Sequence, residues 1–284
     1  MTRLPIVRKT MRDYRGPAIA MLVTMISVAI LDLAIYPSYH ASLKDFQIPD
    51  ALKGFLGGAG SLSSPVGFLT AEFFSWVPLM LVAFAIVAVT GTTAGDEASG
   101  ALDLFLAQPV GRARVLAGKA LGLATLLAVV CVLSYPAFVV TKLFVDFDLR
   151  NLDILAAVIN MVPISWAFLG MGLVAGVVFP SRSSALTFSF GVMIAAYVIY
   201  TLGSAVDLLH SVRLASPFYW ADGSQALSHG LSWERTLVFL AVAACEFGVA
   251  AVLFERRDIM TAHTWPAYLR WRKSRTAPSV LATE

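Results

Sequence analysis

Long apolar runs separated by short polar connectors organise this chain. Six predominantly apolar runs occupy residues 17–36, 73–95, 115–140, 152–179, 185–206 and 236–254. About 20 such residues, rising ~1.5 Å each in a helix, cross a ~30 Å hydrocarbon layer, so we predict six transmembrane helices. Buried helices of a soluble protein are the alternative interpretation, and six runs of this length in one chain argue against it.

Composition supports a membrane protein. Hydrophobic residues make up 58% of the 284 positions and charged residues 14%, whereas soluble domains carry about 25% charged residues. Cys131 and Cys245 each lie alone inside an apolar run, which favours small buried side chains over a disulfide or a metal site. The expected fold class is therefore all-α: a polytopic membrane protein with a six-helix transmembrane domain over residues 1–254.

The basic residues predict the orientation. With the N-terminus inside, 15 of the 21 Lys and Arg residues fall on the inner side, and the six on the outer side are Lys44, Lys53, Lys142, Arg150, Arg213 and Arg235. Lys and Arg gather in cytoplasmic loops, so both termini are expected in the cytoplasm and the protein in the plasma membrane (the inner membrane of a bacterial-type cell). The net charge of +3 then reflects topology and contact with the lipid bilayer, and no nucleic-acid partner is expected.

Both ends of the chain carry sequences suited to the membrane surface. Residues 1–16 mix basic and apolar positions, as in an interfacial helix, although a plain basic anchor fits nearly as well. Residues 255–284 form a basic cytoplasmic tail with Trp265, Tyr268 and Trp271. In the outer connection between the fifth and sixth spans, Trp220 and Trp233 suit the aromatic belt of a membrane interface.

The connector between the second and third spans, GDEASGALDLFLAQPVGRARVLAGK, concentrates charge in an otherwise apolar region. Leu102, Phe105 and Leu106 share one face at helical spacing, and Pro109 ends that helix. Arg112 and Lys119 flank the start of the third span. Residues 96–112 therefore predict an amphipathic helix beneath the cytoplasmic face of the membrane.

This connector resembles that of the permease subunits of ABC exporters of the ABC-2 type. The matching positions are Glu97, Gly100, Leu102, Leu104, Leu106, Pro109, Arg112 and Lys119, while Ala101 and Gly111 depart from the family pattern. SSPVGFLTAEFFS at residues 63–75 is similar to the family's entry into the second span, and FERRDI at residues 254–259 to its exit from the sixth. The resemblance covers nearly the whole chain.

The resemblance implies a half-transporter. Two permease chains, expected to be a homodimer, would each rest on a separately encoded ABC ATPase subunit, and the connector would be the coupling helix seated in that ATPase. The residues expected at this interface are Asp96, Glu97, Gly100, Leu102, Phe105, Leu106, Pro109 and Arg112. Acidic groups near the helix N-terminus suit its dipole, and the Arg112 guanidinium offers a bidentate contact to a carboxylate.

Catalytic motifs are missing from the sequence. GRARVLAGKA at residues 111–120 imitates a phosphate-binding loop, but six residues separate its glycines instead of four, and Ala120 replaces the Ser or Thr that would hold magnesium. The four histidines have no metal-site or triad spacing. We expect no enzyme activity and no cofactor in this chain, with ATP and Mg²⁺ bound by the partner.

Asp32 and Glu246 are carboxylates inside predicted spans. Asp32 lies toward the outer end of the first span and Glu246 in the middle of the sixth. Such groups mark a transport path or a subunit interface, or else pack on a polar neighbour. Gly118 with Gly122, and Gly172 with Gly176, fit GxxxG and predict close helix packing.

Export powered by a separate ATPase is the leading functional hypothesis, with a lipid or another hydrophobic or amphipathic drug-like molecule as the cargo that the apolar spans favour. A secondary transporter or channel without an ATPase is the alternative, although such proteins often carry inverted repeats and charged relays, and the chain has one clear mid-span charge. An integral-membrane enzyme is disfavoured, because the sequence shows no cluster of catalytic carboxylates, histidines or cysteines.

Overall fold

The structure is a computed structural model that describes residues 4–42, 64–95, 111–205 and 211–256. Within these ranges every regular element is a helix, which confirms the all-α fold class. The predicted number of spans is confirmed as well. The helical segments long and apolar enough to cross a membrane are Arg15–His40, Pro65–Gly95, Ala113–Thr141, Asn151–Val178, Arg182–Gly203 and Trp233–Arg256.

The described elements follow one another in this order. α1 (Leu4–Asp13) precedes the first span, which is α2 (Arg15–Ser42). The second span comprises α4 (Pro65–Leu69), η1 (Thr70–Phe74), α5 (Val77–Thr90) and η2 (Gly91–Gly95). The third to fifth are α8 (Arg112–Thr141), α9 (Asn151–Val178) and α10 (Arg182–Ala205). The chain then forms η4 (Val212–Ala215), α11 (Pro217–Trp220), α12 (Gly223–His229) and α13 (Trp233–Arg256).

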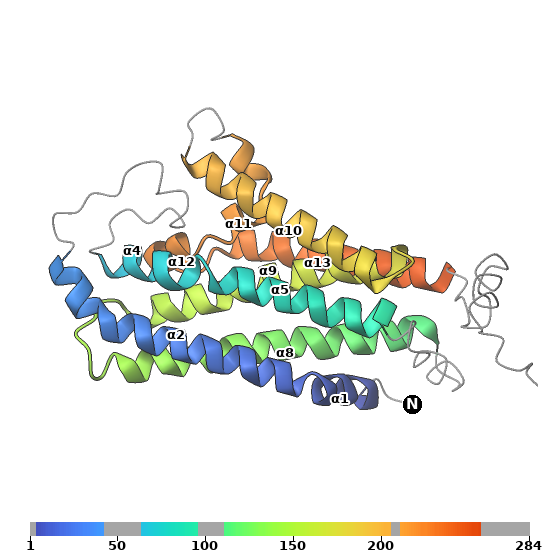
Figure 1. Cartoon of the computed structure of the whole chain (residues 1–284), viewed down its shortest axis with the longest axis horizontal. Helices are drawn as coiled ribbons and strands as arrows, with labels where there is room; N and C mark the ends of the chain where they lie inside the picture. Colours follow the sequence, from blue (N-terminus) through green and yellow to red (C-terminus); the bar gives the residue numbers. More distant parts are fainter. Residues whose placement is uncertain (1–3, 43–63, 96–110, 206–210, 257–284) are drawn as a thin grey trace, which may run out of the picture.

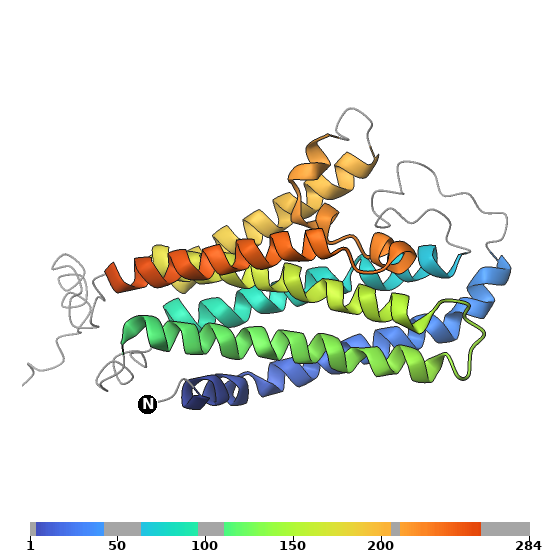
Figure 2. The ribbon, with the colours of Figure 1, turned by 180° about the vertical axis from the view of Figure 1, so that it is seen from behind.

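The helix α9 forms the centre of the bundle. It packs against α5, α8, α10 and α13. In the most apolar stretch of α9, 72% of the residues are buried, whereas in the most apolar stretch of α13 only 22% are buried. On the other side of the bundle α2 and α1 both pack on α8. The long helices run along the long axis of the molecule, whereas α10 diverges from the rest toward its C-terminal end (Figures 1 and 2).

The two ends of the described chain lie at the same end of the bundle. α1 and the C-terminal end of α13 are close to one end of the long axis, and α4 and α12 lie near the other (Figure 1). An even number of spans requires this arrangement. The end that carries α1 is called the base of the bundle below. Its assignment to the cytoplasm stays a prediction.

The second span begins eight residues earlier than the hydropathy pattern predicted, at Pro65 instead of position 73. Pro65 occupies the first helical turn, and the Ser64 hydroxyl oxygen accepts a hydrogen bond from the Gly67 backbone N–H at 3.0 Å, which caps the helix. π-helical turns lie near each end of this span, in η1 and η2. In the first, the Ser75 hydroxyl donates to the Thr70 carbonyl oxygen at 2.8 Å.

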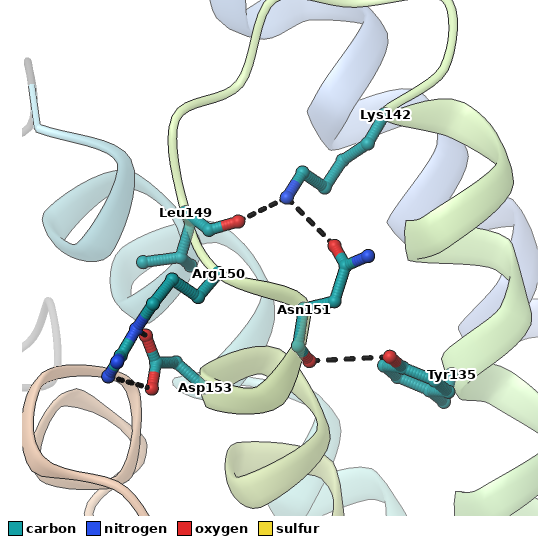
Figure 3. Close-up of polar contacts among 6 residues, drawn as sticks. All are labelled: Tyr135, Lys142, Leu149, Arg150, Asn151 and Asp153. Carbon is teal, nitrogen blue, oxygen red and sulfur yellow. Dashed lines mark hydrogen bonds and ion pairs between the residues drawn. The ribbon is translucent and has the colours of Figure 1, made fainter.

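Polar contacts hold the hairpin between α8 and α9 (Figure 3). Lys142 at the end of α8 donates to the Leu149 carbonyl oxygen and, at 2.9 Å, to the Asn151 side chain. Arg150 binds both carboxylate oxygens of Asp153 at 2.8 Å, and this hydrogen-bonded carboxylate raises the pKa of the guanidinium. The third and fourth spans are thereby tied together at the end opposite the base.

The connection between the fifth and sixth spans contains helices that the aromatic- and Gly-rich sequence did not predict. The Ser216 hydroxyl oxygen caps α11 and the Asp222 carboxylate caps α12. Burial raises the pKa of Asp222, an effect opposed by the hydrogen bond from Ser224 and by two nearby arginines. The Trp220 indole N–H donates to the Leu214 carbonyl oxygen at 2.8 Å. Placement of Trp220 and Trp233 in an aromatic belt stays a prediction.

Candidate functional site

The last turn of the second span, η2, leads directly into residues 96–110. It is a π-helical turn with the sequence GTTAG. The hydroxyls of Thr92 and Thr93 both donate to the Val89 carbonyl oxygen, at 2.9 and 3.0 Å. Carbonyl groups in the last turn of a helix lack an intrahelical donor and can accept hydrogen bonds from other groups. Side chains from three other parts of the base gather around this turn.

Lys119 of α8 supplies the first of these contacts. Its ammonium nitrogen lies 2.9 Å from the Thr92 carbonyl oxygen, and the side chain is only 4% exposed. A buried ammonium group needs good acceptors, because its desolvation costs several kcal/mol. The hydrogen bond from Lys119 therefore holds η2 against α8.

Arg182 and Tyr14 supply the other two. The Arg182 guanidinium, from the first turn of α10, lies 3.4 Å from the Val87 carbonyl oxygen. A Cβ atom placed on Gly91 would be 2.6 Å from the Tyr14 hydroxyl oxygen and 3.4 Å from the Arg182 guanidinium. The exit of the second span is thus enclosed by α8, by α10 and by the joint between α1 and α2.

Small residues bring α9 against the same turn. A Cβ atom on Gly176 would overlap the Thr93 hydroxyl oxygen, and one on Gly172 would lie 2.7 Å from a Val89 methyl group. The close helix packing predicted from this GxxxG pair is confirmed. Any side chain at Gly176 would push η2 away from the central helix.

The second GxxxG pair receives α1. A Cβ atom on Gly118 would lie 2.8 Å from an Ile6 methyl group, and one on Gly122 would lie 2.9 Å from the Thr10 Cβ atom and 3.0 Å from the Val7 carbonyl oxygen. α1 therefore packs directly on the first part of α8. Its position at a membrane surface stays a prediction, but its seat on the third span is a feature of the fold.

The predicted coupling residues fall at the edge of the described structure or beyond it. Asp96, Glu97, Gly100, Leu102, Phe105, Leu106 and Pro109 lie outside the described residues. Arg112 is the first residue of α8, and its side chain is not among those described. The structure instead describes the two helix ends that bracket this segment, η2 and α8, and the contacts that join them.

Asp32 lies on the core side of α2, which packs mainly on α8. The residue is 8% exposed, and its Oδ2 atom has no hydrogen-bond partner among the described residues. Glu72 of η1 is close enough to interact with it electrostatically. The two carboxylates lie toward the end of the bundle opposite the base.

Glu246 lies on α13, which packs mainly on α9. A Cβ atom on Gly170 of α9 would lie 2.5 Å from Glu246 Oε2, so only a glycine leaves room for the carboxylate there. Oε2 has no hydrogen-bond partner among the described residues. Asp32 and Glu246 thus belong to different helix pairs and do not form one site.

The sequence pattern undervalued two basic residues. From sequence, Lys119 flanks the start of the third span, and Arg182 indicates only the topology. Lys119 lies well inside an apolar run, seven residues after Arg112; a lysine at such a depth needs an acceptor, which was a usable signal. The role of Arg182 depends on a contact with a residue 95 positions away and has no local signature.

A comparison with known protein families matches residues 4–259 to the model of the ABC-2 family transporter protein. The match spans all six helical segments and the base described above. A search of curated proteins found no match.

Proposed function

Because the chain belongs to the ABC-2 transporter family, we propose that it is the membrane-spanning half of an ATP-driven exporter. Members of this family are the membrane components of transporters, and its permeases generally work with an ATPase partner. This chain is a multi-pass membrane protein. In the proposed assembly two identical permease chains each rest on one ATPase subunit. That partner binds ATP and Mg²⁺, and both permease termini face the cytoplasm.

One observation carries the proposal. The segment 96–110, which bears the acidic pair Asp96 and Glu97, is bracketed by helix ends that a buried hydrogen bond joins, from Lys119 to Thr92. A displacement of that segment by a soluble partner would therefore reach the second and third spans together. Contacts of this kind favour rigid transmission over independent motion of the two helices.

The surroundings of η2 extend the path. Arg182 of the fifth span donates to the Val87 carbonyl oxygen in the last turn of α5, directly before η2, and Thr93 packs on the central helix at Gly176. In the proposed cycle, ATP binding moves the coupling helix at residues 96–112. The fourth and fifth spans then respond through these two contacts. Export of a hydrophobic or amphipathic molecule follows when the spans rearrange.

The test measures assembly and transport separately. We expect Glu97→Ala and Arg112→Ala to lose co-purification with the ATPase subunit and ATP-driven transport. Arg150→Ala is the matched control, since its charge lies at the opposite end of the bundle and pairs with Asp153. Unchanged assembly and transport in both base variants would rule out the coupling-helix assignment.

A secondary transporter or channel makes the opposite prediction. Transport by the isolated permease in vesicles, driven by an ion gradient and indifferent to ATP, would favour that class of protein. The ATP-driven proposal requires that such vesicles show no uptake until the ATPase subunit and ATP are both supplied.

A further inference from the structure

An apolar groove lies between the fourth, fifth and sixth spans. Its volume is about 540 Å³, within the usual range for small-molecule sites. The divergence of α10 from the bundle, visible in Figures 1 and 2, separates the two outer walls of this groove. Among the described residues that line it, Glu246 is the only one with a charged side chain.

Helical spacing explains the walls. Val192, Ala196 and Ile199 project from one face of α10, and Val238, Val242 and Glu246 from one face of α13. Ala167, Phe168 and Met171 of α9 form the floor. The wall residues Val192, Val238 and Val242 are partly exposed on the outside of the bundle. Apolar side chains exposed on spanning helices suit contact with lipid, which would let the groove open laterally to the hydrocarbon layer.

The carboxylate at the bottom of the groove has an unused acceptor. Glu246 Oε2 is buried and lacks a hydrogen-bond partner among the described residues, and the Met171 backbone lies beside the same carboxylate. A polar group without a partner at this depth is costly. A ligand with a donor group, seated with its apolar body in the groove, removes that cost.

Two cations stand at the outer end of the groove. Arg213 lies over the Tyr219 ring at 4.9 Å, and Arg235 lies 5.8 Å from the Trp220 ring, which lines the groove. Arg235 is eleven residues before Glu246, about 16 Å along the helix. The guanidinium groups are therefore remote from the carboxylate and leave it available.

We propose that this groove binds amphipathic amines from the bilayer, with the ammonium group on Glu246 Oε2 and the alkyl or aryl body between α10 and α13. The assignment deepens the proposed export function and rests on it for the transport step. Binding itself needs only the permease, so the two ideas can fail independently.

The experiment uses the full-length permease in nanodiscs of zwitterionic lipid. The probe is a twelve-carbon alkylamine with a dansyl group at the far end, and the matched neutral probe is its N-acetyl derivative. Fluorescence anisotropy, corrected with empty nanodiscs, gives both affinities. We expect the amine to bind at least about 10-fold more tightly than the acetylated probe, because an ion pair in a water-poor site is strong.

Variants locate the preference. Glu246→Gln keeps the shape of the side chain and is expected to make the two affinities equal. Asp32→Asn, which removes a carboxylate of α2 that does not line the groove, should leave the preference unchanged. Val242→Trp narrows the groove from an exposed wall position that tolerates a larger residue, and should weaken both probes about 10-fold or more.

Three results would overturn the proposal. They are equal affinities of the two probes for the wild type, a preference that survives in Glu246→Gln, and unchanged binding in Val242→Trp. ATPase co-purification of Glu246→Gln is measured in parallel. A variant that assembles normally but loses the amine preference supports the groove, whatever the outcome at Glu97 and Arg112.

Discussion

The ammonium group of Lys119 and the carbonyl oxygen of Thr92 lie 2.9 Å apart, although 27 positions separate the residues in sequence. Thr92 belongs to η2, the last described element of the second span, and Lys119 belongs to α8, the third span. One buried hydrogen bond therefore closes the loop that we propose to dock on the ATPase. Separation of these two helix ends would break this hydrogen bond.

Lys119→Met should reduce ATP-driven transport several-fold while the ATPase subunit still co-purifies, since the change alters the closure of the loop and not the docking surface. The unpaired Thr92 carbonyl group should lower stability by about 1–3 kcal/mol. Lys142→Met is the control, because that lysine holds carbonyl and amide oxygens at the opposite end. Equal transport by the two variants would contradict the role given to Lys119.

Gly176→Ala should separate α9 from η2. The new methyl group would overlap the Thr93 hydroxyl oxygen, and relief of such an overlap costs about 1–3 kcal/mol. Gly191→Ala adds the same methyl group on α10 where nothing lies within 4 Å. Thermal unfolding in one detergent should show a lower midpoint for Gly176→Ala alone. Matching midpoints would mean that the contact is not tight.

Gly122→Val should lift α1 from α8. The larger side chain meets Thr10 and the Val7 backbone at about 3 Å, and a helix backbone cannot yield locally. Thr10 is 5% exposed, so the thiol of Thr10→Cys, in a background with Cys245→Ser, should resist maleimide until Gly122→Val is added. Gly248→Val, in open surroundings, should leave that thiol protected. Labelling that is equal with and without Gly122→Val would place α1 elsewhere.

The proposed orientation is tested by labelling from one side. Phe144, in the hairpin between α8 and α9, is 82% exposed, and Ser183 lies in the exposed first turn of α10. In intact cells a membrane-impermeant maleimide should react with Phe144→Cys and not with Ser183→Cys. Ser183→Cys should react only after permeabilisation. The reverse pattern would invert the topology.

Hydropathy was sufficient to locate the transmembrane helices, whose backbone groups must form all their hydrogen bonds within the helix in lipid. Each predicted span overlaps an observed one because a run of about 20 apolar residues has few alternatives. The start of the second span was missed, since Val66 to Leu69 are apolar but follow a Ser- and Gly-rich stretch, and the cap at Ser64 decides the boundary. The short helices between residues 212 and 229 were missed because their stability comes from caps and packing rather than from periodicity.

The candidate sites divide in the same way. Glu246 and Asp32 could be named from sequence, because a carboxylate inside an apolar run is conspicuous. The surroundings of these carboxylates could not be predicted from sequence. Gly170 and Glu246 are far apart in the chain, and no local pattern indicates that the glycine leaves room for the carboxylate. The enclosure of η2 depends on side chains from three separate elements. The coupling residues from Asp96 to Pro109 lie outside the described residues and stay predictions.

The central position of α9 also has a consequence for biogenesis. The ribosome delivers α2, α5 and α8 to the bilayer before the helix around which the bundle is built. Until residue 178 has been inserted, these three helices can use only the contacts that they make with one another, such as those of α2 on α8 and the bond from Lys119 to Thr92. Insertion of the fourth helix thus completes a half-built bundle, and the last two helices add to a core that already exists.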